Sequence, residues 1–214
     1  MSVPRNRRWF LAAAAESAAG LALGGWAAGL PAAPGRSSGG LTIIDAHTHF
    51  YDPTRPEGVP WPSRDEKLLY RRVLPPDYRA LPTPEPVEGT VVVEASPWVE
   101  DNAWVLKLAA ADPFIVGLVG NLPIGSQPFA GLVKRFAADR LFRGIRIRDR
   151  KLEGTLEDRA FLADVKLLAD HDLSLDLVGG VEILPFAERL AREVPALRIV
   201  IDHLAGLPVD GKPF

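Results

Sequence analysis

The sequence predicts an α/β fold of the (β/α)8 barrel type, with about six of the eight βα units present. Apolar, β-branched segments alternate with amphipathic ones at intervals of about 25 to 30 residues, which indicates a parallel sheet. Polar residues also follow the carboxyl end of nearly every expected strand. A barrel collects such residues from all its strand tops, whereas an open doubly wound sheet concentrates them at one switch point. No glycine-rich phosphate loop follows the first strand, which further favours the barrel.

Each element follows from its local pattern. Continuous β-favouring runs predict the strands, and apolar residues spaced three or four apart predict the helices, with Asp101 as the N-cap of the first of these. The expected strands are 41–44 with the polar residues that follow, 90–94, 114–119, 143–148, 173–178 and 198–203. The expected helices cover 101–111, 129–136, 156–170 and 183–194.

The first strand carries the most informative motif, Asp45-Ala46-His47-Thr48-His49. Side chains alternate along a strand, so His47 and His49 point to one side and Thr48 points to the other. Two neutral imidazoles at a strand end form half of a metal site or a polar cradle for a substrate oxygen. The chain has only four histidines, which weakens chance as an explanation for two of them lying one residue apart.

The same alternation places further candidates inside the barrel. In the fourth strand the isoleucines share one side, so Arg146 and Arg148 face the interior; in the fifth, Asp176 faces inward. His203 shares the register of outward residues, but strand ends often bulge, so parity alone leaves its direction open. His171 precedes its strand and is expected at the bottom of the barrel, as a surface or helix-end histidine.

Composition sets loose limits. The chain has 214 residues, of which 47% are hydrophobic and 24% charged, as expected of one globular domain with a full core. A net charge of −2 gives no indication of nucleic-acid binding or of an acidic membrane surface. The absence of cysteine excludes disulfides, thiolate metal sites and a cysteine nucleophile.

The first 34 residues have the form of an export signal. Arg7-Arg8-Trp9-Phe10-Leu11 resembles the twin-arginine pattern and precedes a mildly apolar, Ala- and Gly-rich stretch. A membrane anchor or a disordered tail is the alternative, and Glu16 and the glycines disfavour a stable spanning helix. The expected organisation is therefore a signal over 1–34, cleaved between 28 and 35, a linker over 35–40 and a partial barrel over 41–214. It predicts recognition by the twin-arginine export machinery, a periplasmic or secreted location and no stable membrane anchoring after cleavage.

Two motifs together resemble a known family. Ile43-Ile44-Asp45-Ala46-His47-Thr48-His49-Phe50 and the later Val200-Ile201-Asp202-His203-Leu204-Ala205 are similar to the amidohydrolase-related (amidohydrolase 2) branch of the amidohydrolase superfamily. Within that branch, the chain most resembles the fuconolactonases and pyrone-dicarboxylate lactonases. Three shorter segments strengthen the match, Val59-Pro60-Trp61, Phe142-Arg143-Gly144-Ile145-Arg146 and Leu175-Asp176-Leu177-Val178. The resemblance runs from about residue 42 to the C-terminus.

The resemblance implies a role for several of these residues. His47 and His49 match the family's first-strand pair, and His203 matches its sixth-strand histidine. Arg146 matches an arginine that holds the carbonyl or carboxylate of the substrate, for which a planar fork of donors is suited. Asp202 is expected to orient a neighbouring group rather than react.

Four further residues are candidates for substrate binding. Trp61 would cover a sugar or pyrone ring, or else pack beneath its loop. Glu94 would contact the substrate or a metal, or else pair with an arginine. Arg148 and Asp176 complete this set as inward-facing residues of their strands.

Two departures limit the expected metal content. Family members with two metals have a lysine after the fourth strand, where this chain has Arg146 and Arg148, and the fifth strand has Asp176 where a histidine is usual. At most one divalent ion is therefore expected, zinc being the candidate, and several lactonase relatives need none. His47 and His49 are the firmest expected ligands, with His203 or Glu94 completing a site that keeps one position open for water.

The resemblance predicts hydrolysis of a lactone, a cyclic ester of a sugar acid or of an aromatic-degradation intermediate. Non-oxidative decarboxylation is a rival within the branch. A third alternative is an inactive fragment or binding domain, because six strands are expected and the family's eighth-strand aspartate, the general base, has no counterpart. Truncation is the expectation that follows, and the open sheet edges would favour association into an oligomer.

Overall fold

The structure is a computed structural model that describes residues 42–148, 152 and 154–210. The chain divides into two units, Met1–Gly40 and Leu41–Phe214, and the description concerns the second. The predicted export signal over 1–34 and linker over 35–40 lie outside the described residues and stay predictions. No helix in the described part of the chain is long and apolar enough to cross a membrane.

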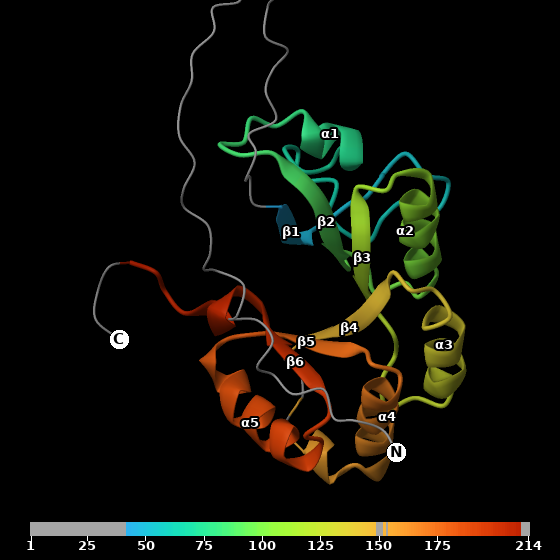
Figure 1. The fold of residues 1–214 in the computed structure, drawn as a ribbon, viewed down its shortest axis with the longest axis vertical. Helices are drawn as coiled ribbons and strands as arrows, with labels where there is room; N and C mark the ends of the chain where they lie inside the picture. Colours follow the sequence, from blue (N-terminus) through green and yellow to red (C-terminus); the bar gives the residue numbers. More distant parts are fainter. Residues whose placement is uncertain (1–41, 149–151, 153, 211–214) are drawn as a thin grey trace, which may run out of the picture. The chain divides into compact units, whose positions relative to one another are not determined.

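The described residues form one sheet of six strands, all of them parallel. The strands lie side by side in chain order, and α2 to α5 line one face of the curled sheet (Figure 1). A doubly wound sheet would reverse its order at a switch point, so sequential order confirms a barrel-type sheet with part of the full set of strands. The strands are β1 (Ile43–Thr48), β2 (Val87–Val93), β3 (Ile115–Gly120), β4 (Phe142–Arg148), β5 (Ser174–Val178) and β6 (Arg198–Ile201).

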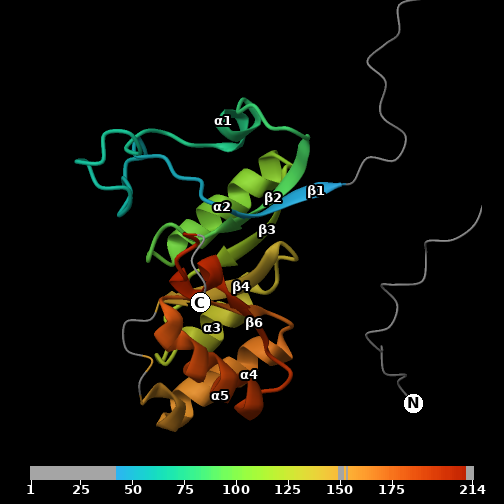
Figure 2. The same cartoon turned by 90° about the vertical axis from the view of Figure 1, so that its left-hand side faces the viewer.

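Five α-helices connect these strands in the described part of the chain: α1 (Pro75–Arg79), α2 (Glu100–Ala111), α3 (Phe129–Phe136), α4 (Arg159–Asp170) and α5 (Leu184–Glu193). The four longer helices match the predicted ones, and the short α1 was not expected. It begins at two prolines, which suit the first turn of a helix, and it follows a long connection from β1 that stands out from the sheet (Figure 2). Three 3-10 turns complete the set, η1 (Thr155–Glu157), η2 (Val181–Ile183) and η3 (Asp202–Gly206).

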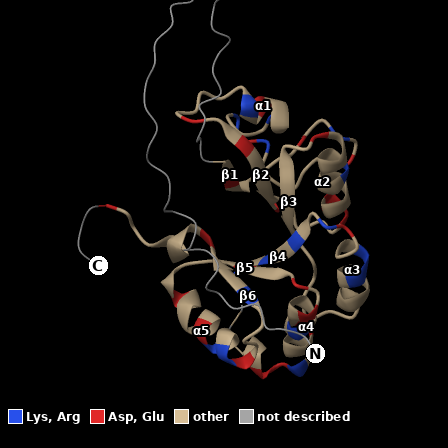
Figure 3. Ribbon diagram, in the orientation of Figure 1, with Lys and Arg blue, Asp and Glu red and all other residues tan. Residues whose placement is uncertain are grey.

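The core lies between the sheet and the helices. Ile145, Leu175 and Leu177 are fully buried there, as are Val165 on α4 and Leu190 on α5. Each such side chain contributes about 1.5–3 kcal/mol when it leaves water. The residues between them on β4 and β5 therefore face the other side of the sheet. Apart from the charged residues on the strands, most charged residues lie on helices and loops (Figure 3).

Several predicted boundaries were wrong, and two of them concern residues that the sequence singled out. The residue that caps the start of α2 is Val99, which has helical backbone angles, and Asp101 lies within the first turn. The last strand ends at Ile201 and does not reach His203, because the backbone turns into η3 at Asp202. That early end decides which residues of this segment reach the site.

Candidate functional site

The end of β1 presents the two predicted imidazoles on one side. The ring centroids of His47 and His49 lie 5.1 Å apart in a T-shaped arrangement. Thr48 points away from them, and its buried hydroxyl lies 2.8 Å from that of Thr90 on β2. The side-chain alternation of the strand therefore continues through the motif, as predicted.

His49 is held in one orientation and one protonation state. Its Nδ1 lies 2.9 Å from the carbonyl oxygen of Val93, which can only accept a hydrogen bond, so Nδ1 carries the proton. Burial lowers the pKa of His49 to about 4, and this imidazole is therefore neutral at pH 7. Its Nε2 keeps a free lone pair for a water, a substrate group or a metal.

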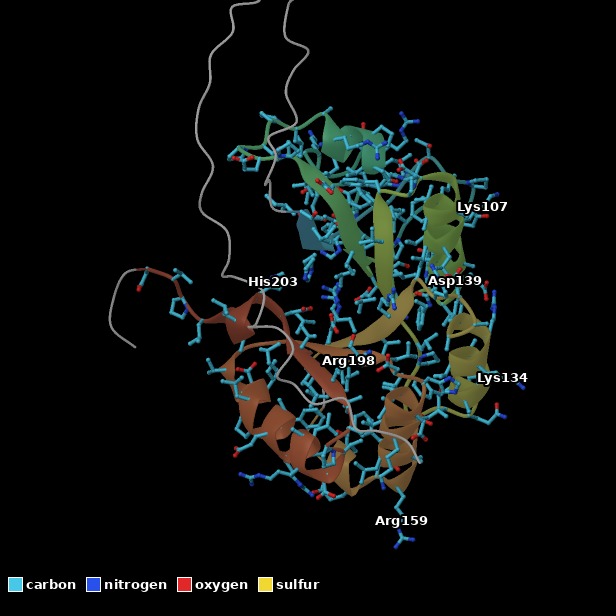
Figure 4. All side chains as sticks on the ribbon, viewed as in Figure 1. Lys107, Lys134, Asp139, Arg159, Arg198 and His203 are labelled. Atoms are coloured by element: carbon cyan, nitrogen blue, oxygen red, sulfur yellow. The ribbon has the colours of Figure 1, made fainter. Side chains whose placement is uncertain are left out.

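A second cluster joins β1 to the turn after β6. The ring of His203 lies 4.7 Å from that of His47, on the side of the turn that faces β1 (Figure 4). The buried carboxylate of Asp202 lies 3.7 Å from Nδ1 of His47. The candidate ligand atoms of these three residues all lie within 4.8 Å of one another. Sequence reasoning gave Asp202 only an orienting role, and the structure places it inside the cluster.

This cluster fits a divalent metal ion. Nε2 of His47 and Oδ2 of Asp202 are buried and have no hydrogen-bond partner within the described residues. Burial lowers the pKa of His47, although Asp202 partly offsets the shift, so the neutral imidazole that a metal requires is favoured. Two imidazoles and one carboxylate form a donor set typical of zinc. His49, predicted as a ligand, lies next to this triad but outside it.

An unusual backbone conformation builds the cluster. His203, Leu204 and Ala205 all have left-handed angles, with φ between 52° and 54°, and Gly206 follows at 64°. Each non-glycine residue in this region costs about 1–3 kcal/mol, which the surroundings must offset. Asp202 and Ala205 are almost fully buried, and their packing anchors the turn. The turn directs Asp202 inward and His203 toward β1, which a continuing strand would not do.

Arg146 lies deeper than a substrate-binding arginine is expected to lie. Its side chain is only 4% exposed, and Nε donates a hydrogen bond to Oε1 of Glu94 at 2.8 Å. A terminal nitrogen donates to the carbonyl oxygen of Glu94, and another lies 3.7 Å from Asp202. Arg146 is therefore bound to protein acceptors, and Glu94 is paired with an arginine, one of its two predicted roles. Direct contact of Arg146 with a substrate stays a prediction.

The other predicted residues surround this buried pair. The side chain of Arg148 is 57% exposed and approaches Glu94 only at 3.4 Å, so its other donors remain available to a ligand. Asp176 accepts a hydrogen bond from the Ser174 hydroxyl at 2.9 Å, and burial raises the pKa of its carboxyl group to about 6. The Trp61 ring lies 5.8 Å from that of His49. His171 is exposed at the end of α4, as predicted.

Histidines, a buried carboxylate and an exposed arginine gather at the carboxyl ends of the parallel strands, which is where barrel folds carry their functional sites. The family comparison agrees with a barrel fold of this kind. Residues 44–213 match the family model Amidohydro_2, described as amidohydrolase. The chain belongs to this amidohydrolase family.

Two curated relatives share sequence with the chain. An L-fucono-1,5-lactonase of Burkholderia ambifaria is 33% identical over 168 residues, covering 78% of this chain and 58% of the relative. A second L-fucono-1,5-lactonase, from Burkholderia multivorans, is 27% identical over 175 residues, covering 79% and 57%. The chain thus spans less than two thirds of the length of these relatives.

Solved structures agree on the fold. An amidohydrolase from Burkholderia multivorans with bound zinc superposes with a TM-score of 0.65 at 24% identity, covering 77% of this chain and 58% of that one. A putative 2-pyrone-4,6-dicarboxylic acid hydrolase from Pseudomonas putida gives a TM-score of 0.57 at 20% identity, covering 78% and 58%. At these identities the likeness concerns the scaffold.

Proposed function

We propose that this protein hydrolyses a lactone, a cyclic ester of a sugar acid or of an aromatic-degradation intermediate. The observation that carries the proposal is the convergence of His47, His49 and His203 at one end of the sheet, beside the buried Asp202. The named activities of the relatives support it, since both curated relatives are L-fucono-1,5-lactonases.

The residues suited to a metal ion are His47, Asp202 and His203. A bound zinc ion would supply Lewis acidity, polarising the ester carbonyl and lowering the pKa of water. Nε2 of His47 and Oδ2 of Asp202, which have no hydrogen-bond partner among the described residues, support this assignment, because an uncompensated buried polar atom is costly.

The chain's own side chains would orient the substrate and the water. The lone pair on Nε2 of His49 accepts a hydrogen bond from the attacking water, and the hydrogen bond to Val93 fixes its direction. Arg148 donates hydrogen bonds to the ester carbonyl, whose oxygen gains negative charge as water attacks. Trp61 covers the ring. Water then adds to the carbonyl carbon and loses a proton, the ring C–O bond breaks, and that proton goes to the released alkoxide oxygen, which gives the hydroxy acid.

The buried pair of Glu94 and Arg146 would serve as the rigid support of this site. It connects the end of β2 to β4, and through Asp202 it reaches the turn after β6. Side chains with fixed partners need not reorient when charge develops in the reaction, so the free-energy cost of reorganisation is smaller. The support therefore favours the same geometry before and during hydrolysis.

Hydrolysis of a lactone panel by the full chain, followed by acid release at constant pH, tests the proposal. The panel contains L-fucono-1,5-lactone and 2-pyrone-4,6-dicarboxylate, each with and without added zinc. We expect catalysis that His49→Gln abolishes and that His171→Gln, a substitution at the exposed end of α4, leaves unchanged. No rate above the spontaneous one would refute the assignment and favour a binding domain, and equal loss of rate in both variants would refute the placement of the active site at His49.

We further propose export through the twin-arginine route, supported by the Arg7-Arg8 motif. Lysine substitution of both arginines, followed by cell fractionation, tests it. We expect the protein in the periplasm or medium, and its retention in the cytoplasm when both arginines are replaced. An unchanged distribution would contradict this route.

A further inference from the structure

Arg55 connects the long loop after β1 to helix α2. Its guanidinium pairs with Asp101 in the first turn of α2, with 2.9 Å between nitrogen and oxygen. The same nitrogen donates to the carbonyl oxygen of Gly58 at 3.0 Å, and the guanidinium carbon lies 4.4 Å from the centre of the Trp104 ring. The two charged side chains are only 11% and 18% exposed. An arginine suits this position because a planar cation can stack and donate at once.

The loop that Arg55 fixes also carries Trp61. Its base is closed by two backbone hydrogen bonds between Tyr51 and Val73, and the backbone hydrogen bonds within 52–72 join residues of the loop to one another. Three residues after Gly58, the Trp61 ring packs against Tyr51 at 5.2 Å and against His49 at 5.8 Å. The position of the ring at the site therefore depends on a contact made elsewhere in its loop.

The cleft behind this loop is narrow. It is lined by Arg55, Trp61, Glu94, Asp101 and Trp104, among others, and its interior has room for about one water molecule. A substrate ring does not fit there while the loop is closed. The loop therefore covers this cleft, and the ion pair between Arg55 and Asp101 helps to hold the loop in that position.

We propose that Arg55 is a positioning residue, which holds the loop against α2 so that Trp61 stays against the ring of His49. Its effect on catalysis rests on the proposed lactonase function, whereas its effect on the position of Trp61 does not. Without the contact to Asp101 and Trp104, the loop opens more often and Trp61 leaves the ring of His49. The substrate then loses its cover, although the histidines keep their places.

A matched pair of arginines allows a direct test. Arg79 also pairs with an aspartate, Asp112 at 2.8 Å just after the end of α2, and also lies over an aromatic ring, that of Phe114 at 5.1 Å, and neither partner belongs to the loop that carries Trp61. Acrylamide quenching of Trp61 fluorescence is measured in the full chain, in Arg55→Ala and in Arg79→Ala. Subtracting the signal of each protein's Trp61→Phe counterpart isolates this tryptophan. Asp101→Asn provides a second, milder variant if Arg55→Ala does not fold.

We expect quenching of Trp61 to rise about twofold in Arg55→Ala and in the same direction in Asp101→Asn, with no change in Arg79→Ala. For a lactone that the wild type hydrolyses, we expect KM to rise about tenfold in Arg55→Ala while kcat changes less than about twofold. Unchanged quenching in both Arg55→Ala and Asp101→Asn would overturn the proposal, whatever the activity. Raised quenching in a chain without lactonase activity would support the positioning role and refute the proposed function.

Discussion

Replacing Glu94 with glutamine removes one charge from the buried centre of the site and keeps its shape. Arg146 would retain an acceptor at Oε1 and the backbone carbonyl, but its nearest countercharge, at 2.8 Å, would disappear. The remaining carboxylate, Asp202, lies 3.7 Å away. The variant therefore measures how much folding stability is lost when the buried Arg146 keeps only one of these two carboxylates, that of Asp202.

The expected cost follows from burial. Arg146 and Glu94 have side chains only 4% and 8% exposed, so water screens their interaction little. Removing one partner of a buried ion pair costs about 3–5 kcal/mol, and the retained hydrogen bond and Asp202 reduce this to about 2–3 kcal/mol. For a domain of this size, that loss corresponds to a decrease of about 4–12 °C in Tm.

Urea unfolding and thermal denaturation at pH 8, both followed by circular dichroism, measure the loss. Glu100→Gln is the matched control, because Glu100 pairs with Arg135 at the same 2.8 Å but with side chains 71% and 48% exposed. We expect no measurable change in the control, since exposed pairs contribute little. Equal effects of the two substitutions, or a loss below about 1 kcal/mol in Glu94→Gln, would show that burial does not strengthen the pair of Glu94 and Arg146.

Three further predictions concern the same region. The pKa of Asp176 is raised to about 6 by burial, so the folded state holds its proton more tightly than the unfolded state. Stability should therefore fall by up to about 3 kcal/mol as the pH rises from 4 to above 6, and Asp176→Asn should remove this dependence in urea titrations. Zinc at 100 times its Kd should stabilise the chain by about 2.7 kcal/mol, and calorimetric titration should show binding weakened at least about tenfold in His203→Ala. Tyr78→Phe removes a 2.8 Å hydrogen bond to Asp45 and should cost about 1 kcal/mol in urea unfolding; no loss would show that this contact is dispensable.

Much of the scaffold could be predicted because parallel strands are buried on both faces. Such strands are continuous apolar runs, and Val91-Val92-Val93 is typical of them. The alternation of side chains along β5 then predicted that Leu175 and Leu177 pack on the helices. It also predicted that Asp176, between them, faces the site. The short helix α1 was missed because five residues are too few to show a helical period.

The site was harder to predict because its key contacts depend on three-dimensional pairing. Extending the alternation of β6 to His203 fails, since the left-handed turn changes the direction of each side chain and brings Asp202 into the cluster. The contact of Arg55 with Asp101 joins residues from a long loop and a helix, which no local pattern reveals. Burial of Arg146 against Glu94 likewise joins two strands far apart in the sequence.

Nitrogen-15 NMR of the histidine side chains during lactone addition probes the proposed site itself, because three of the chain's four histidines belong to it. We expect the signals of His47, His49 and His203 to shift, and proton spectra of the same sample to show the hydroxy acid product. The signal of His171 should stay in place. Shifts at no histidine, or at His171 alone, would contradict a lactone site at the end of this barrel.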